Sequence, residues 1–214
     1  MILMDRKPFE YTMEQLRQEA QDWYPLWKEL QAYIAPERGF FQGQQPNKSK
    51  GIDYKILLDS TPTRDLRIFA SGMMGLCTSP SRPWFKIGLP DRELMEFHPV
   101  KIWLNDVQQI LMDIYSRSNI YNTFYTLYEE LGAFCTAAAY IGEDYYDVVR
   151  GRAFTIGQYY LGTGPDGRVN TFTREYWMTA YQLVKEFGYD NVTVAVKNAY
   201  DNNKLFQWFQ VCHL

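Results

Sequence analysis

The apolar positions of the first forty residues recur at helical intervals and predict a helix that a proline interrupts. The stripe comprises Leu16, Ala20, Trp23, Trp27, Leu30 and Ile34. We expect this helix to open at Thr12, because Gln15 completes a capping-box pattern three residues later. Pro25 lacks the backbone N–H that a helix needs, so it should kink or split the element before Pro36 ends it. Residues 39–51 then read as a polar loop.

Three further helices follow the loop. The second begins near Thr61, because Pro62 suits the first helical position, and it stops before the proline-containing segment 78–83, which should run extended. The third covers 100–114 and the fourth 120–134, and the short break between them predicts a helical hairpin. The residues expected to face inward are Leu66, Phe69, Met73 and Leu76, then Val100, Trp103, Leu104, Val107, Ile110, Leu111 and Ile114, then Ile120, Phe124, Leu127, Leu131 and Phe134.

The sequence also predicts the surroundings of several individual residues on these helices. Small side chains on the second helix should let another backbone approach closely, and they are Ala70, Ser71, Gly72 and Gly75. Glu129 and Glu130 are adjacent on the fourth helix and are predicted to lie on its solvent face. Cys135 follows an apolar helix face, which is typical of an inert core thiol.

The character of the chain changes after residue 137, where short strand-like runs replace the helical spacing. A strand over 138–141 leads into the acidic loop 143–147. The runs 153–161 and 168–178 should pair as a hairpin around 162–167, because a Pro-Asp-Gly sequence there favours a turn.

The last third of this region adds two helices and a strand. A helix through Leu183 and Phe187 should stop at Gly188, and a short helix should cover 192–200. A strand is expected over 205–213. No polar tail follows that strand, so we interpret Leu214 as a point of truncation.

Together these elements predict an α+β fold. A mainly helical part, 1–137, should pack on a mixed part, 138–214, that contains the hairpin 153–178. The net charge of −3 comes without a dense run of Lys and Arg, which argues against tight binding of DNA phosphates. Aromatic residues make up 17% of the chain and suit either subunit interfaces or an aromatic core.

Cysteine usage and hydropathy indicate the compartment. Three isolated cysteines give no disulfide framework, which is typical of a reducing cytoplasm. The N-terminus does not resemble a signal peptide, and no apolar run approaches the roughly 18 to 20 residues that span a bilayer. We therefore expect no membrane partner.

The candidates for chemistry are few. Glu143, Asp144 and Asp147 could serve as acid and base or bind a hard cation, but a solvated loop after a strand is the favoured explanation. The first alternative would make the chain a hydrolase that uses exposed aromatics as a platform, and a further alternative is a monomeric cytoplasmic binding module.

Other motifs have simpler explanations. Gly162, Gly164 and Gly167 match G-x-G-x-x-G, but a strand-like run follows them, so a hairpin turn is favoured over a dinucleotide site. His98 and His213 are far apart in sequence, and no zinc-ligand spacing surrounds them. We assign no catalytic, cofactor-binding or metal-binding residue, and we expect neither a cofactor nor enzymatic activity.

An ordered series of segments resembles the podovirus-type portal, or head-to-tail connector, family. The most specific is Cys77-Thr78-Ser79-Pro80-Ser81-Arg82-Pro83-Trp84-Phe85-Lys86. The other segments are Ala32 to Gly39 (AYIAPERG), Leu58 to Thr61 (LDST), Ala70 to Leu76 (ASGMMGL), Ser118 to Tyr121 (SNIY), Leu131 to Phe134 (LGAF), Gln158 to Leu161 (QYYL), Gly167 to Thr171 (GRVNT) and Arg174.

The resemblance implies a structural ring subunit at one capsid vertex of the virion, with twelve copies around a channel. It implies that double-stranded DNA passes through during packaging and ejection without sequence-specific binding. The implied partners are further copies of the subunit, the capsid protein, the terminase and tail adaptor proteins, after synthesis in the host cytoplasm. The chain would correspond to the N-terminal, wing portion of a longer protein, and the family has no catalytic motif to transfer.

Overall fold

The computed structural model describes residues 7–39 and 59–214, which form two compact units. Of these residues, one unit contains 7–28, 39 and 157–214, and the other contains 29–38 and 59–156. The units therefore differ from the predicted parts 1–137 and 138–214, because the first helix belongs with strands near the end of the chain. Most of the predicted polar loop, 40–51, lies outside the described residues.

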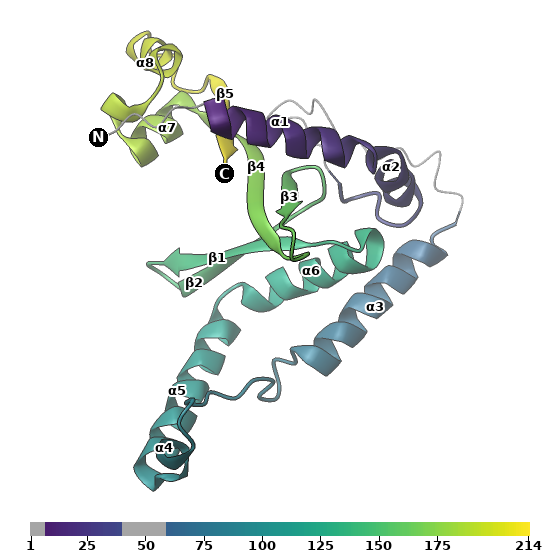
Figure 1. The fold of residues 1–214 in the computed structure, drawn as a ribbon, viewed down its shortest axis with the longest axis vertical. Coiled ribbons are helices and arrows are strands. Elements are labelled where there is room, and N and C mark those ends of the chain that lie inside the picture. Colours follow the sequence, from purple (N-terminus) through teal and green to yellow (C-terminus); the bar gives the residue numbers. More distant parts are fainter. Residues whose placement is uncertain (1–6, 40–58) are drawn as a thin grey trace. The chain divides into compact units, whose positions relative to one another are not determined.

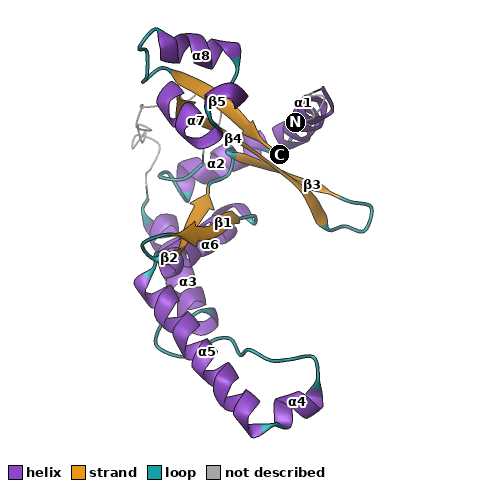
Figure 2. Cartoon of the chain, turned by 90° about the vertical axis from the view of Figure 1, so that its left-hand side faces the viewer, coloured by secondary structure: helices purple, strands orange, loops and turns teal. Residues whose placement is uncertain are grey.

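The unit that contains 59–156 is built from four helices and a β-hairpin (Figures 1 and 2). Its elements are α3 (Thr61–Cys77), α4 (Arg92–Glu96), α5 (His98–Arg117), α6 (Ile120–Phe134), β1 (Ala138–Asp144) and β2 (Val148–Phe154). The two strands are antiparallel, and Ala138 pairs with Phe154. Helix α6 lies between α3 and the hairpin, so it forms the centre of this unit.

Helix α6 packs on α3 through small residues. Ala70 of α3 is fully buried, and a Cβ atom on Gly132 of α6 would lie 2.8 Å from side-chain carbons of Leu66 and Phe69. The predicted close approach is therefore confirmed at Ala70. Gly72 and Gly75 instead point into open space, on the opposite side of α3.

Helix α6 also packs on β2, where the contact is equally close. The Asn119 side chain donates a hydrogen bond to the Gly151 carbonyl (2.7 Å) and accepts one from the Gly151 N–H (2.8 Å). A Cβ atom at position 151 would lie 2.5 Å from Oγ1 of Thr123, which is itself buried. Only glycine therefore allows the strand to approach the first turn of α6 this closely.

The predicted hairpin of the third and fourth helices is wrong. Helix α6 continues from the end of α5 at an angle and lies along α3, as both ribbon views show (Figures 1 and 2). The indole of Trp84 fills the corner between them, because it contacts Tyr115 of α5 and Phe124 of α6. The segment before it, 78–83, was predicted to run extended, but it contains a turn at residues 80–81.

Part of the predicted inward face of these helices is exposed to solvent. The confirmed buried residues are Leu66, Leu104, Ile120 and Phe134. The predictions were wrong for Phe69, Leu76, Trp103, Ile110 and Leu131, which are exposed. Helical spacing identified amphipathic segments correctly, but both α3 and α5 carry more apolar surface than α6 covers. Short helix α4 was not predicted.

The unit that contains 157–214 is a three-stranded antiparallel sheet with flanking helices (Figure 2). Its elements are α1 (Lys7–Gln21), β3 (Tyr159–Thr163), β4 (Val169–Thr179), α7 (Ala180–Phe187), the 3₁₀ turn Tyr189–Asn191, α8 (Val194–Asp201) and β5 (Trp208–His213). The strand order is β3-β4-β5, which places β4 in the centre. Helices α7 and α8 enclose an apolar cluster around Leu183 and Val196.

The predicted interruption of the first helix is confirmed. Helix α2 (Tyr24–Tyr33) begins one residue before Pro25, and α1 ends at Gln21. The predicted cap at Thr12 is wrong, because α1 begins five residues earlier and the Thr12 hydroxyl donates to the Pro8 carbonyl within the helix.

The C-terminal predictions hold in outline, and the secondary structure confirms an α+β fold. The helix that stops at Gly188 is confirmed, since this residue takes a φ of 82° and its N–H donates to Val184. The β3–β4 hairpin is confirmed, but its first strand starts at Tyr159 because residues 153–154 belong to β2. No helix among the described residues is long and apolar enough to cross a membrane.

The close approach at Gly151 yields a first prediction. Gly151→Ala should lower the free energy of unfolding by about 1–3 kcal/mol, because the new methyl group overlaps Thr123. Chemical denaturation of the purified chain measures this loss. Gly72→Ala is the matched control and should raise stability by about 0.5–1 kcal/mol, since it adds a better helix former facing open space. Equal effects of the two changes would contradict the packing described here.

Candidate functional site

Two adjacent carboxylates on α6 occupy buried positions, contrary to the predicted solvent face. Glu130 is fully buried, and its Oε2 accepts a hydrogen bond from the N–H of Ile156 at 3.3 Å. The side chain of Thr155 also hydrogen-bonds to this carboxyl group. Glu129 is buried beside it and forms an ion pair with Arg38. Neighbouring residues on a helix point about 100° apart, so the two carboxylates serve different partners.

Glu130 and Asn119 hold α6 along β2 at two points. Eleven residues of helix separate Asn119 from Glu130, a rise of about 16 Å. Five residues of extended chain separate their partners Gly151 and Ile156, which is also a length of about 16 Å. Both partners are backbone groups, and the register between α6 and β2 also requires glycine at position 151.

The ion pair of Glu129 connects α6 to the segment that precedes the undescribed residues. Arg38 also accepts a hydrogen bond at its carbonyl from Gln31, and the Thr63 hydroxyl donates to the Ile34 carbonyl at 3.0 Å. A small open pocket lies here, and it is lined by Ala35, Pro36, Glu37, Arg38, Thr63, Leu66, Arg67 and Glu129. These contacts fix residues 31–38 on α3 and α6 and leave little room for a ligand.

The environment of Glu130 favours its neutral form. Burial raises the pKa of the Glu130 carboxyl, against the opposing effect of the hydrogen bonds from Thr155 and Ile156 and the nearby charge of Arg38. Its second oxygen, Oε1, is buried and has no hydrogen-bond partner in the described part of the chain. A buried oxygen without a partner makes the charged form of this carboxyl more costly, in line with its raised pKa.

Helical spacing in the sequence already places Glu130 on the buried face of α6, but its charged side chain led to the opposite prediction. Ile120, Thr123, Leu127, Glu130 and Phe134 recur at three- and four-residue intervals and therefore share one face of α6. The two polar members of this face, Thr123 and Glu130, are buried with Ile120 and Phe134, while Leu127 is half-buried. The predicted inward face was defined by apolar residues alone, so it was centred too close to Leu131, which is exposed.

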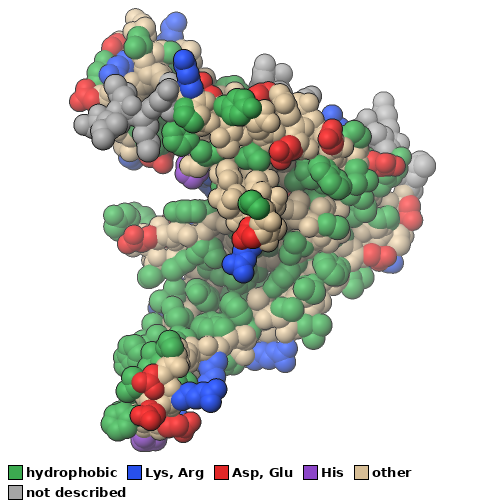
Figure 3. Space-filling view, in the orientation of Figure 1, with side chains coloured by type: hydrophobic (Ala, Val, Ile, Leu, Met, Phe, Trp, Pro, Cys, Tyr) green, Lys and Arg blue, Asp and Glu red, His purple; other side chains and the backbone are tan. Residues whose placement is uncertain are grey.

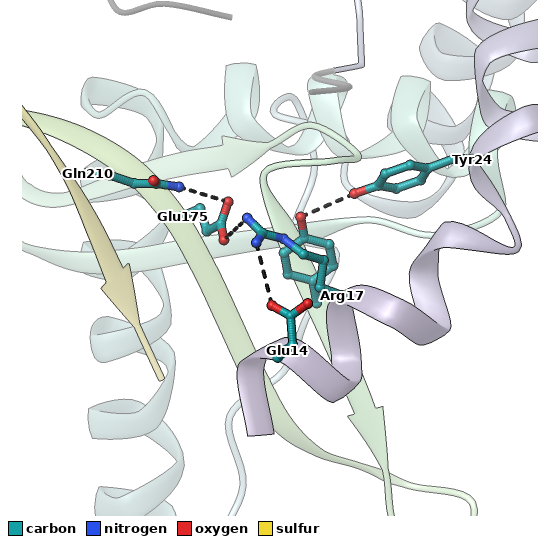
Figure 4. A network of polar contacts seen from close by, with 6 residues as sticks. Glu14, Arg17, Tyr24, Glu175 and Gln210 are labelled. Carbon is teal, nitrogen blue, oxygen red and sulfur yellow. Dashed lines mark hydrogen bonds and ion pairs between the residues drawn. The ribbon is translucent and has the colours of Figure 1, made fainter. Parts of the chain in front are cut away.

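A second polar network lies in the other unit, between α1 and the sheet (Figure 4). Arg17 of α1 forms an ion pair with Glu175 of β4 at 2.5 Å, and Glu14 lies 3.6 Å from the same guanidinium group. Gln210 of β5 donates to the other Glu175 oxygen at 3.2 Å. This network fixes α1 on β4 and explains why the first helix belongs with the end of the chain.

Tyrosine hydroxyls continue this network into the core. Tyr24 and Tyr160 hydrogen-bond to each other at 3.1 Å, and with Leu16 they form a buried cluster. Burial and the contact with Tyr160 raise the pKa of the Tyr24 hydroxyl, so it stays protonated. The Arg17 and Tyr24 contacts are structural, because each joins one protein element to another.

The predicted acidic loop is the turn of the β1–β2 hairpin. Oδ1 of Asp144 accepts hydrogen bonds from the N–H groups of Tyr146 (2.8 Å) and Asp147 (3.0 Å), and these bonds lower the pKa of its carboxyl. Glu143 and Asp147 are exposed, and Arg150 lies 3.8 Å from Asp144. A general acid needs a raised pKa, so this carboxyl is poorly suited to the hydrolase alternative. Its hydrogen bonds serve the turn.

The remaining candidates are dispersed. Gly162, Gly164 and Gly167 lie in the β3–β4 hairpin, where Gly167 takes a φ of 72°, so the turn interpretation is confirmed. His98 begins α5 and His213 ends β5. All three cysteines are exposed, so the prediction of a core thiol at position 135 is wrong; this residue ends α6 with a φ of 58°. No group of three metal-ligating side chains occurs within residues 7–39 and 59–214.

The family model and the individual proteins that resemble this chain point to the same kind of protein. A family model described as "Bacteriophage head to tail connecting protein" matches residues 6–214. The chain is 40% identical over 209 residues to the "Probable portal protein" of Bordetella phage BPP-1, which covers 98% of this chain and 38% of that protein. It is 39% identical over 201 residues to the "Portal protein" of Salmonella phage epsilon15, with 94% and 36% covered. The chain thus spans less than two fifths of the length of these relatives.

The buried Glu130 predicts a pH-dependent stability. Its folded-state pKa lies above the ordinary value of 4.5, so the folded state holds the proton more tightly than the unfolded state. The contribution of Glu130 to stability should therefore fall as pH rises from about 4.5 through the folded-state pKa. Glu130→Gln cannot ionise, and its stability relative to the wild type should increase over this range. Urea denaturation between pH 4 and pH 8 measures the difference.

Two comparisons make this measurement specific. Glu143→Gln removes an exposed carboxyl and should leave the pH dependence unchanged. Glu130→Ala should lower the free energy of unfolding by about 1–3 kcal/mol, because the Ile156 N–H loses its acceptor. A constant difference between Glu130→Gln and the wild type across the pH range would show that burial does not control this carboxyl.

Proposed function

Because this chain belongs to the bacteriophage head to tail connecting protein family, we propose that it is part of a portal subunit, a structural component of the virion. The observation that carries the proposal is its similarity to two proteins named as portal proteins over more than nine tenths of its length. In this role the subunit lies at one capsid vertex, where head and tail join. The present residues form its N-terminal wing portion.

The proposed assembly is a ring of twelve copies around a channel for double-stranded DNA. Genomic DNA enters through this channel under the action of a terminase and leaves through it at ejection, while the capsid protein and tail adaptors bind the outside. A channel of this kind should not hold DNA tightly, and the net charge of −3 without a dense basic run agrees with that requirement. Synthesis takes place in the host cytoplasm before assembly.

A ring subunit needs rigid elements that present two different surfaces to its neighbours, because heterologous contacts close a ring by rotation. The register of α6 and β2, held by Asn119 and Glu130, supplies such rigidity in one unit. The Arg17–Glu175 ion pair does so in the other. These polar groups are engaged in joining protein elements, which supports a structural role without catalysis.

Electron microscopy of the complete protein tests the proposed assembly. We expect closed rings with a central hole, and native mass spectrometry should give the number of copies. A complete protein that remains a monomer at micromolar concentration would contradict the portal role and favour a binding module.

The acidic turn allows a test against the hydrolase alternative. Asp144→Asn keeps one oxygen to accept the N–H bonds of Tyr146 and Asp147, so the hairpin should stay folded. Ring formation and DNA packaging should then equal those of the wild type within twofold. A loss of packaging in a variant that still forms rings would indicate that this carboxyl takes part in chemistry.

A further inference from the structure

Helix α5 presents an apolar and acidic face to solvent. Trp103, Asp106, Ile110 and Asp113 follow one another at three- and four-residue intervals, so they share one face. Trp103 is 61% exposed and Ile110 is 57% exposed. Large apolar side chains gathered on one helix face are typical of a surface that another protein covers. We refer to these four residues as the acidic face of α5.

Helix α3 presents a different face, which is apolar and basic. Ile68 is 62% exposed and Leu76 is 75% exposed, opposite the buried Leu66 and Ala70. Open space surrounds Gly72 and Gly75 on this side of the helix. Arg64 and Arg67 are exposed on this side as well, and Asp65, three residues before Ile68, shares it, so the side carries two basic residues and one acidic residue. We refer to Arg64, Arg67, Ile68, Gly72, Gly75 and Leu76 as the basic face of α3.

The arginines of the basic face are available for other partners. Arg64 lies 3.5 Å from Asp65, and Arg67 lies 3.6 Å from Glu37, with all four side chains more than half exposed. Ion pairs of this kind contribute little, so a partner that buries the arginines can replace them. Among the ion pairs and hydrogen bonds of the described residues, none includes Asp106 or Asp113.

The charges of the two regions are complementary. Helix α3 and the segment that follows it, residues 61–90, carry four basic side chains and one acidic side chain. Residues 91–117, which include α4 and α5, carry five acidic side chains and three basic ones. Arg117, four residues after Asp113, shares the acidic face of α5, so that face carries two Asp and one Arg. In the space-filling view, hydrophobic side chains cover much of the surface over α5 and α6, and acidic side chains gather near α4 (Figure 3).

From this complementarity we propose that the acidic face of α5 in one copy of the chain binds the basic face of α3 in the next copy. The inference rests on the proposed ring, since a ring requires two unlike surfaces on each subunit. A two-fold contact between like faces would bring like charges together. Trp103 and Ile110 are the apolar anchors of this interface, and Gly72 and Gly75 let the partner helix approach the α3 backbone.

Charge exchange in the complete protein tests this pairing. One variant carries Asp106→Arg and Asp113→Arg, and a second carries Arg64→Glu and Arg67→Glu. Each variant alone opposes like charges at every contact, so the concentration needed for half-assembly should rise at least tenfold. An equimolar mixture restores opposite charges when the two variants alternate, so rings should reappear with equal numbers of each. When one variant is isotopically labelled, native mass spectrometry of the rings gives the number of copies of each variant, and equal numbers are expected.

The controls separate this inference from the proposed function. Glu19→Arg with Glu186→Arg makes the same charge change at exposed sites on other helices and should leave rings intact. If the wild type forms rings and both exchanged variants also do so, the pairing of these faces is overturned while the ring stands. If both variants fail and the mixture stays unassembled, these residues affect assembly without pairing with each other, and the pairing is again overturned.

Folding is checked independently, because a misfolded variant would also fail to assemble. Thermal unfolding of each variant should fall within a few degrees of the wild type, since all four positions are exposed. Should a double variant unfold, the single changes Asp113→Lys and Arg67→Glu repeat the mixing experiment. A wild-type protein that does not form rings at all would instead refute the portal assembly itself.

Discussion

The architecture of the unit around α6 depends on hydrogen bonds between two side chains, Asn119 at the N-cap of α6 and Glu130 within it, and backbone groups in β2 and just after it. Asn119 holds Gly151 at the start of α6, and Glu130 holds Ile156 near its end. The spacing works because eleven residues of helix and five of extended chain both measure about 16 Å. A shift of one residue along β2 would break both contacts and would drive a side chain into Thr123.

This central packing has a consequence for the outer helices. Helix α6 is covered by α3 on one side and by the hairpin on the other, so its own apolar face is satisfied. Within the described residues, helices α3 and α5 keep large apolar side chains such as Ile68 and Trp103 exposed on one side. The rigid centre therefore presents apolar surface outward in a fixed geometry, which is what a subunit of a larger assembly requires.

A buried carboxyl at the centre of such a frame has a thermodynamic cost that an amide would avoid. Glu130 keeps one oxygen without a hydrogen-bond partner in the described part of the chain, and burial raises its pKa. Two hydrogen bonds offset part of this cost. Glu130 accepts one from the Ile156 N–H and forms another with Thr155, and together they hold the backbone just beyond β2 in place. In the other unit, Arg17 and Glu175 achieve a comparable attachment through opposite charges at a partly exposed site.

The sequence by itself determined the local elements and the family. Periodicity located the helices α3, α5 and α6, Pro25 located the break after α1, and the Pro-Asp-Gly run located the β3–β4 turn, because these features depend on near neighbours in the chain. Only the tertiary structure decided which apolar residues are covered and which charged ones are buried. Glu130 is buried against residues just beyond β2, and local spacing encodes neither this contact nor the exposure of Trp103.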